Sequence, residues 1–154
     1  MFNLLNKNKN NKNKKLKYNY IDTILSSSKV KQLRKTSFEK LYAIFLRKNE
    51  DDSFSIINFY EYGNGNSERI LPETYKPNKI PKMNMLFKAD AIVMLHNHPR
   101  YNGLYSIAYP STSDINSTIS AGELWQSKGC FLLDHIIINE DDYYSFAQND
   151  LIII

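Results

Sequence analysis

Short apolar segments separated by polar turns run along most of the chain. Residues 38–46 and 54–60 are aromatic and β-branched with a charged RKNEDD turn between them, which predicts an antiparallel hairpin. A second hairpin is predicted from the apolar segments 130–139 and 143–147, which flank an acidic EDD turn. The run AIVML at 91–95 has the length and β-branched content of a buried strand.

Helical patterns separate these strands. Apolar residues recur at helical spacing over 21–33, which predicts a first helix. A second helix is expected to begin at Pro77 or Pro81 and to run to about Lys88, because proline is tolerated in the first turn. The segment 115–129 predicts an amphipathic helix with glycine in the usual C-terminal position. This order of elements predicts the α/β class, with a mixed β-sheet flanked by helices.

Charge is distributed unevenly along the 154 residues, which carry 20 basic and 16 acidic side chains. Residues 7–17 contain six lysines and no acid, so the rest of the chain has 14 basic residues against 16 acidic ones. We expect 1–17 to be a disordered Lys/Asn-rich tail, because it cannot bury apolar surface, and 18–154 to be one domain. The tail would either make weak contact with nucleic acid or be only a solvated low-complexity segment, and we favour the second interpretation.

Cysteine and hydropathy indicate the compartment. Cys130 is the single cysteine, which excludes an internal disulfide and a Cys-rich zinc finger. No run approaches the roughly 18 apolar residues that span a bilayer, and no signal segment is recognisable. We therefore expect a cytoplasmic protein without a membrane partner.

Two histidines and a carboxylate give the strongest chemical signal. His96 and His98 follow the strand predicted at 91–95, and side chains two apart on a strand point to the same face. Asp114 lies where the next helix is expected to begin. Two imidazoles, one carboxylate and an open fourth position are typical of a catalytic rather than a structural zinc site. A His-x-His pair alone is a weak signal, so the prediction depends on this context.

A zinc hydrolase also needs a base that accepts the proton of a water molecule. Glu39 is the candidate, because it interrupts apolar residues at the start of a predicted strand. A charge at the sheet edge is an equally open interpretation. His135 lies beside Asp134 in an apolar strand, and we expect it to be hydrogen-bonded in the core or behind the site rather than to be a ligand.

Five motifs follow one another in a set order. They are Glu39-x-x-Tyr42-x-x-Phe45-Leu46, His96-Asn97-His98-Pro99, Ser111-x-x-Asp114, LLDHIII at 132–138 and YYSFA at 143–147. Together they resemble the bacterial RadC-like proteins of the JAB/JAMM (MPN) metalloprotease group, from about Ser37 to Leu151.

The resemblance implies a cytidine-deaminase-like α/β/α fold. It also implies zinc held by His96, His98 and Asp114, with Glu39 as the catalytic base and Ser111 steadying the oxyanion or the water. The implied function is that of a zinc-dependent metallohydrolase, a peptidase or isopeptidase of JAMM type with a protein or peptide substrate. The alternative is a noncatalytic or DNA-repair-associated RadC-like module with a bound metal and weak nucleic-acid contact.

Two features depart from the family pattern. The segment 99–110 is longer than usual, and its Tyr101, Tyr105 and Tyr109 would either line a substrate cleft or cover the site. Nothing in residues 1–36 resembles the helix-hairpin-helix region of longer RadC-like proteins. The oligomeric state and the substrate are not predicted.

Overall fold

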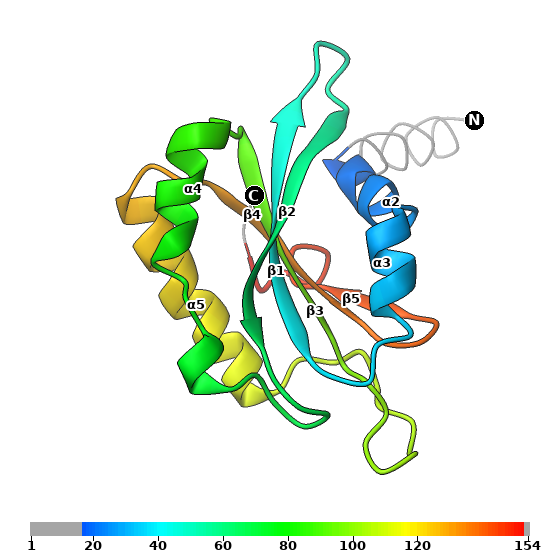
Figure 1. Ribbon diagram of the computed structural model, residues 1–154. Helices are drawn as coiled ribbons and strands as arrows, with labels where there is room; N and C mark the ends of the chain where they lie inside the picture. The colour runs from blue at the N-terminus through cyan, green and yellow to red at the C-terminus, as the bar shows by residue number, and fades with distance from the viewer. Residues whose placement is uncertain (1–16, 153–154) are drawn as a thin grey trace, which may run out of the picture.

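A five-stranded mixed sheet forms the middle of three layers in the computed structural model, which describes residues 17–152 (Figure 1). The strands lie in the order β2-β1-β3-β4-β5, and only β3 and β4 are parallel neighbours. Their bounds are β1 Lys40–Lys48, β2 Phe54–Asn64, β3 Ala91–Asn97, β4 Leu132–Ile138 and β5 Tyr143–Ser145.

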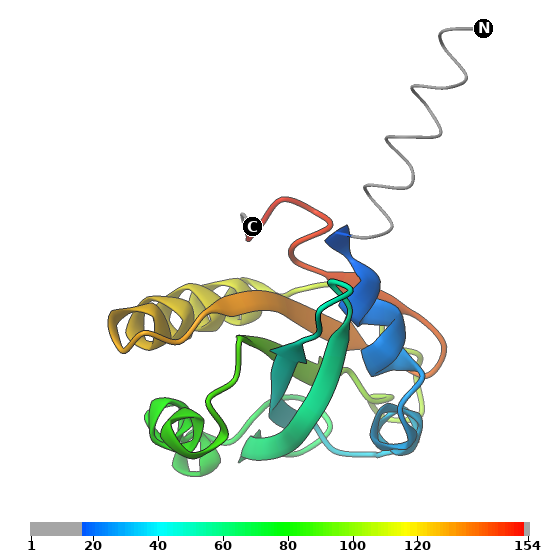
Figure 2. The same ribbon diagram turned by 90° about the horizontal axis from the view of Figure 1, so that it is seen from above.

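Helices cover both faces of this sheet. Figure 2 shows α2 (Asn19–Leu25) and α3 (Ser28–Leu33) on one side and α4 (Lys79–Phe87) and α5 (Thr112–Ser127) on the other. A short 3-10 helix, η1 (Pro72–Thr74), lies between β2 and α4. The α/β fold with a mixed sheet and flanking helices is therefore confirmed.

Side-chain alternation along the strands produces two separate cores. Tyr42 and Ile44 of β1 pack in the core beneath α2 and α3, whereas Ala43 and Phe45 pack in the core beneath α4 and α5. This follows because successive strand residues point to opposite faces, and it explains why β1 reads as a continuous apolar run. Trp125 of α5 is fully buried in the second core.

The predicted hairpins and the helix ending near residue 88 are confirmed, but the single helix over 21–33 is wrong. The chain forms two helices there, with the break at Ser26 and Ser27. The Ser27 side chain accepts a hydrogen bond from the Val30 amide and begins α3 as its N-cap. The apolar spacing continues across the break, so periodicity alone does not reveal it.

The tail predicted at 1–17 lies outside the described residues, except for Lys17. Within the described part of the chain, every helix is too short or too polar to cross a membrane.

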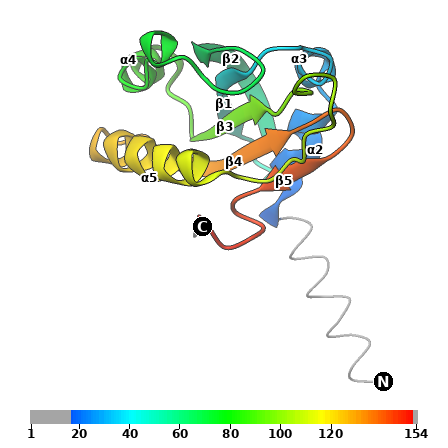
Figure 3. The same cartoon turned by 90° about the horizontal axis from the view of Figure 1, so that it is seen from below.

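The connection between the parallel strands places the candidate site. A parallel pair needs a crossover, and here the chain leaves β3, forms the loop 99–110, and returns through α5 to β4. Figure 3 shows this loop and the start of α5 at the end of β3. The carboxyl end of β3 and the amino end of α5 therefore meet beside each other, where α/β folds commonly bind ligands.

Candidate metal centre

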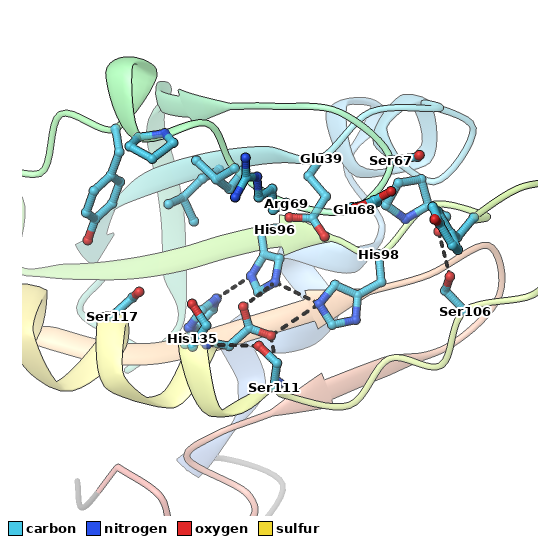
Figure 4. Close-up of a pocket in the computed structure, with 18 residues that line it drawn as sticks. Glu39, Ser67, Glu68, Arg69, His96, His98, Ser106, Ser111, Ser117 and His135 are labelled. Carbon is cyan, nitrogen blue, oxygen red and sulfur yellow. Dashed lines mark hydrogen bonds and ion pairs between the residues drawn. The ribbon is translucent and has the colours of Figure 1, made fainter.

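Three side chains converge where β3 ends and α5 begins. The His96 Nε2 and His98 Nε2 atoms are 3.0 Å apart, and each lies 3.3 Å from an oxygen of Asp114. Donor atoms at about 2.0–2.1 Å from a tetrahedral zinc ion lie about 3.3 Å from one another, so this spacing fits a metal site. The group could therefore hold a metal ion, and two imidazoles with one carboxylate suit a transition metal such as zinc. Figure 4 shows both histidine side chains turned toward this point.

Asp114 is held in place by the start of its own helix. Its backbone amide donates to Ser111 Oγ at 3.1 Å, and the Ser111 amide donates to Asp114 Oδ2 at 2.9 Å, a capping box. Burial opposes ionisation, but the adjacent imidazoles of His96 and His98 and the amide of Ser111 hold the pKa of Asp114 well below its ordinary value. Asp114 is therefore a carboxylate, and the long preceding loop does not displace it.

Ser111 lies at the edge of the site. Its hydroxyl oxygen accepts the Asp114 amide, which leaves the hydroxyl proton free to donate into the cleft that Ser111 lines.

Glu39 directly precedes the neighbouring strand β1 and faces the three converging side chains. Leu41 pairs with His96, so in this antiparallel register Glu39 stands across from His98. Burial raises the pKa of Glu39 to about 7, an effect that nearby His98 reduces and Asp114 reinforces. A carboxyl with this pKa exchanges a proton readily near neutral pH, as general-base chemistry requires.

Asn97 holds Glu39 and was not anticipated from the sequence. Its Oδ1 accepts the Lys40 amide at 2.8 Å and its Nδ2 donates to the Phe38 carbonyl at 2.8 Å. The available signal was that a polar residue between two candidate ligands points to the opposite face of the strand, where a buried amide must find partners.

His135 lies behind His96, as expected for a histidine that is not a ligand. Its Nε2 is 2.6 Å from His96 Nδ1, and its Nδ1 is 2.6 Å from Thr118 Oγ1 on α5. Complete burial lowers the pKa of His135 well below its ordinary value, so the ring is neutral. Thr118 also donates to the Asp114 carbonyl at 2.6 Å, and no sequence signal singled it out.

The loop 99–110 supports His98. The Ile107 carbonyl accepts a hydrogen bond from His98 Nδ1 at 3.0 Å, which leaves Nε2 turned toward Asp114. Asn139, at the end of β4, donates to the Ser106 carbonyl at 3.0 Å and to the Tyr105 hydroxyl at 2.7 Å. The loop is thus fixed to the turn between β4 and β5.

Of the three loop tyrosines, only Tyr101 takes one of the two roles left open by the sequence. Tyr101 lines the cleft beside the site. Tyr105 donates to Asp141, and Tyr109 packs edge-on against Tyr144 with ring centroids 5.2 Å apart.

A cleft of about 720 Å³ gives access to the converging side chains. Its lining includes Glu68 and Arg69 after β2, Tyr101 of the loop 99–110, and the start of α5. Figure 4 shows Glu39 above His96 and His98 and Ser111 below them, and both residues line the cleft. The arrangement can hold a metal ion between a proton acceptor and a hydroxyl donor at the floor of a groove large enough for a peptide segment.

Comparison with known proteins places these features in a family. The model of the RadC-like JAB domain matches residues 18–151. A UPF0758 protein of Fusobacterium nucleatum is 32% identical over 74% of this chain and 44% of its own length. UPF0758 proteins of Alteromonas mediterranea and Streptococcus gordonii are 30% and 31% identical over 79% and 85% of this chain. The chain spans about half the length of these relatives, 48% and 55% in the last two cases.

Proposed function

The chain belongs to the RadC-like JAB domain family, and from this membership and the geometry of its site we propose that it is a zinc-dependent hydrolase of peptide or isopeptide bonds. The observation that carries the proposal is the position of Glu39, a buried carboxyl with a pKa of about 7 that faces the His96, His98 and Asp114 donor group. A metal site alone would need no such group, since desolvating a carboxylate costs stability.

Each residue has a defined part in this proposal. His96, His98 and Asp114 would hold the metal ion, which as zinc would supply Lewis acidity toward the scissile carbonyl and would lower the pKa of water to about 7. Glu39 takes a proton from the attacking water and delivers it to the leaving amine. Ser111 donates its free hydroxyl proton to the developing oxyanion, and the cleft walls align the substrate.

The decisive experiment changes Glu39 to Gln in the zinc-loaded protein. The variant keeps the shape and one acceptor oxygen but cannot take the proton, so zinc content and fold should survive. Hydrolysis, measured with a panel of peptides and isopeptide-linked conjugates, should fall by about 10²-fold or more. Glu68→Gln removes an exposed carboxylate from the same cleft and should retain most of the activity.

Metal analysis tests the ligands separately. We expect about one zinc per chain, loss of the metal in His96→Ala and His98→Ala, and strongly weakened binding in Asp114→Ala. Loss of zinc in Glu39→Gln would make Glu39 a ligand rather than a base. Unchanged activity in that variant would place the base elsewhere.

A noncatalytic module is the competing outcome. Firm zinc binding with no cleavage by the wild type across the panel would favour it. DNA binding that weakens steeply with salt and is abolished by deleting residues 1–17 would add a nucleic-acid contact through the Lys-rich segment.

A further inference from the structure

A chain of three hydrogen bonds runs behind the metal site, from the ring of His96 back to α5. It passes through His135 and Thr118 and ends at the carbonyl of Asp114, so both of its ends belong to proposed metal ligands. All three contacts measure 2.6 Å. His96 and His135 are 3% exposed and Thr118 is also buried, so water does not compete for these bonds.

The donor in each of the three hydrogen bonds follows from the last bond, between Thr118 and the Asp114 carbonyl. A carbonyl oxygen only accepts, so the 2.6 Å contact between Thr118 Oγ1 and the Asp114 carbonyl requires the hydroxyl proton to lie between them. Without that proton, two acceptor oxygens would repel each other. A threonine in a helix commonly makes this bond to the carbonyl four residues earlier.

The remaining protons then follow in order. Because the Thr118 hydroxyl donates its only proton to the Asp114 carbonyl, its oxygen must accept a hydrogen bond from His135 Nδ1. A neutral His135 that is protonated on Nδ1 offers a lone pair on Nε2, so His96 Nδ1 must donate to it. The proton of His96 therefore lies on Nδ1, and its Nε2 lone pair points to Asp114 and His98, where a metal ion would bind.

We propose that Thr118 is a positioning residue that sets the metal-binding tautomer of His96 through His135. The inference rests on the proposed metal site. These three hydrogen bonds, here called the relay, are needed because the Asp114 carboxylate lies 3.3 Å from His96 Nε2 and attracts a proton to it. This nitrogen must stay unprotonated to bind a metal ion. Thr118 opposes that pull from the far side of the ring.

The test compares Thr118→Val with Thr118→Ser. Valine keeps the volume but removes the hydroxyl, so His135 shifts its proton to Nε2 and forces the His96 proton onto the ligand atom. Zinc affinity, measured by competition with a chromophoric chelator, should fall by about 10–100-fold, the usual effect of losing a group that orients a ligand. Serine retains the hydroxyl and should bind zinc within about threefold of the wild type.

Thr23→Val is the matched control. Thr23 makes the same type of bond to the carbonyl four residues earlier, on α2 at the other face of the sheet, so its loss should leave zinc affinity unchanged. Nitrogen chemical shifts of the imidazoles in the metal-free protein give a second readout. They should place the His96 proton on Nδ1 in the wild type and on Nε2 in Thr118→Val.

Each contrary result has its own meaning. Equal zinc affinity in wild type and Thr118→Val, or an equal loss in Thr118→Ser and Thr118→Val, overturns the relay while leaving the metal site standing. A wild-type His96 protonated on Nε2 overturns it even if Thr118→Val does not fold. Absence of zinc binding in the wild type overturns the proposed function and this inference together.

Discussion

The side chain of Asn97 holds the main chain on both sides of Glu39. It accepts from the Lys40 amide and donates to the Phe38 carbonyl, both at 2.8 Å. Asn97 is the last residue of β3 and lies between His96 and His98, so one short segment presents two candidate ligands to one face and fixes the position of the candidate base from the other. The distance between base and metal site is thereby built into the pairing of β1 with β3.

Asn97→Ala should therefore reduce catalysis more than metal binding. Two backbone groups lose their partners, which should lower the free energy of unfolding by about 2 kcal/mol. Zinc content should remain, while kcat falls at least about tenfold because Glu39 is no longer held at its distance from the site. Asn149→Ala, which removes an amide contact to the Ser145 carbonyl, is the control. An unchanged kcat in Asn97→Ala would show that the position of Glu39 does not depend on the two hydrogen bonds of Asn97.

Local patterns of apolar and polar residues predicted the five strands and α5, and the positions of Pro77 and Pro81 predicted α4. The break at Ser27 escaped because a hydroxyl cap restarts the helix without disturbing the apolar spacing. The break was nevertheless readable in principle, since a run of three serines favours a cap over a helix interior.

The candidate site also contains residues that could be predicted from the sequence and residues that could not. His96, His98 and Asp114 could be grouped from the sequence because a strand end and a helix start meet in this fold. Asn97 and Thr118 could not, because their roles depend on partners 57 and 17 residues away. The support that Ile107 gives to His98 comes from a backbone carbonyl, which has no signature in the sequence.

Asn139 should control His98 through the loop 99–110. Asn139→Asp keeps the oxygen that accepts the amides of Asp141 and Asp142, so the turn should persist. It removes both donors to the loop, so the Ile107 carbonyl should no longer fix the His98 ring. Zinc affinity should fall by about 10-fold, and amide hydrogen exchange over 99–110 should accelerate.

Arg34→Gln provides the comparison for Asn139→Asp. Arg34 donates to the carbonyls of Asn139 and Asp142 from the side of α3, so its loss weakens the turn without touching the loop. A similar fall of zinc affinity in both variants would mean that turn stability, rather than the loop contact, holds His98.

Asp134 should tolerate asparagine but not leucine. Its Oδ2 accepts from two hydroxyls, those of Tyr20 and Ser145, which can rotate to accept from an amide instead. Its Oδ1 accepts from the amides of His135 and Ala147, which can only donate. Asp134→Asn keeps that oxygen, so the free energy of unfolding, measured with urea, should fall by less than about 1.5 kcal/mol. Asp134→Leu leaves both amides without an acceptor, so the free energy of unfolding should fall by about 3 kcal/mol or more. Equal losses of stability in the two variants would contradict the assignment of different roles to Oδ1 and Oδ2.

Glu39 should make the metal-free protein less stable as the pH rises. Its pKa is about 7 in the folded chain against an ordinary 4.5, because burial disfavours the carboxylate. Between these two values the unfolded chain binds fewer protons than the folded chain, so stability falls with rising pH and the loss is complete above about pH 7. Glu39→Gln cannot ionise and should escape this loss.

The measurement is urea unfolding of both proteins in the presence of a chelator from pH 4.5 to pH 8. We expect Glu39→Gln to have nearly the wild-type stability at the acidic end and to exceed it by on the order of 2 kcal/mol above pH 7, since the cleft admits water and reduces the full effect of the shift. Such a gain would mean that the chain retains a destabilising carboxylate at this position, as sites kept for activity rather than stability do. Parallel stability curves for the two proteins would show that the Glu39 carboxyl is not desolvated, and would remove the main reason for assigning it the role of base.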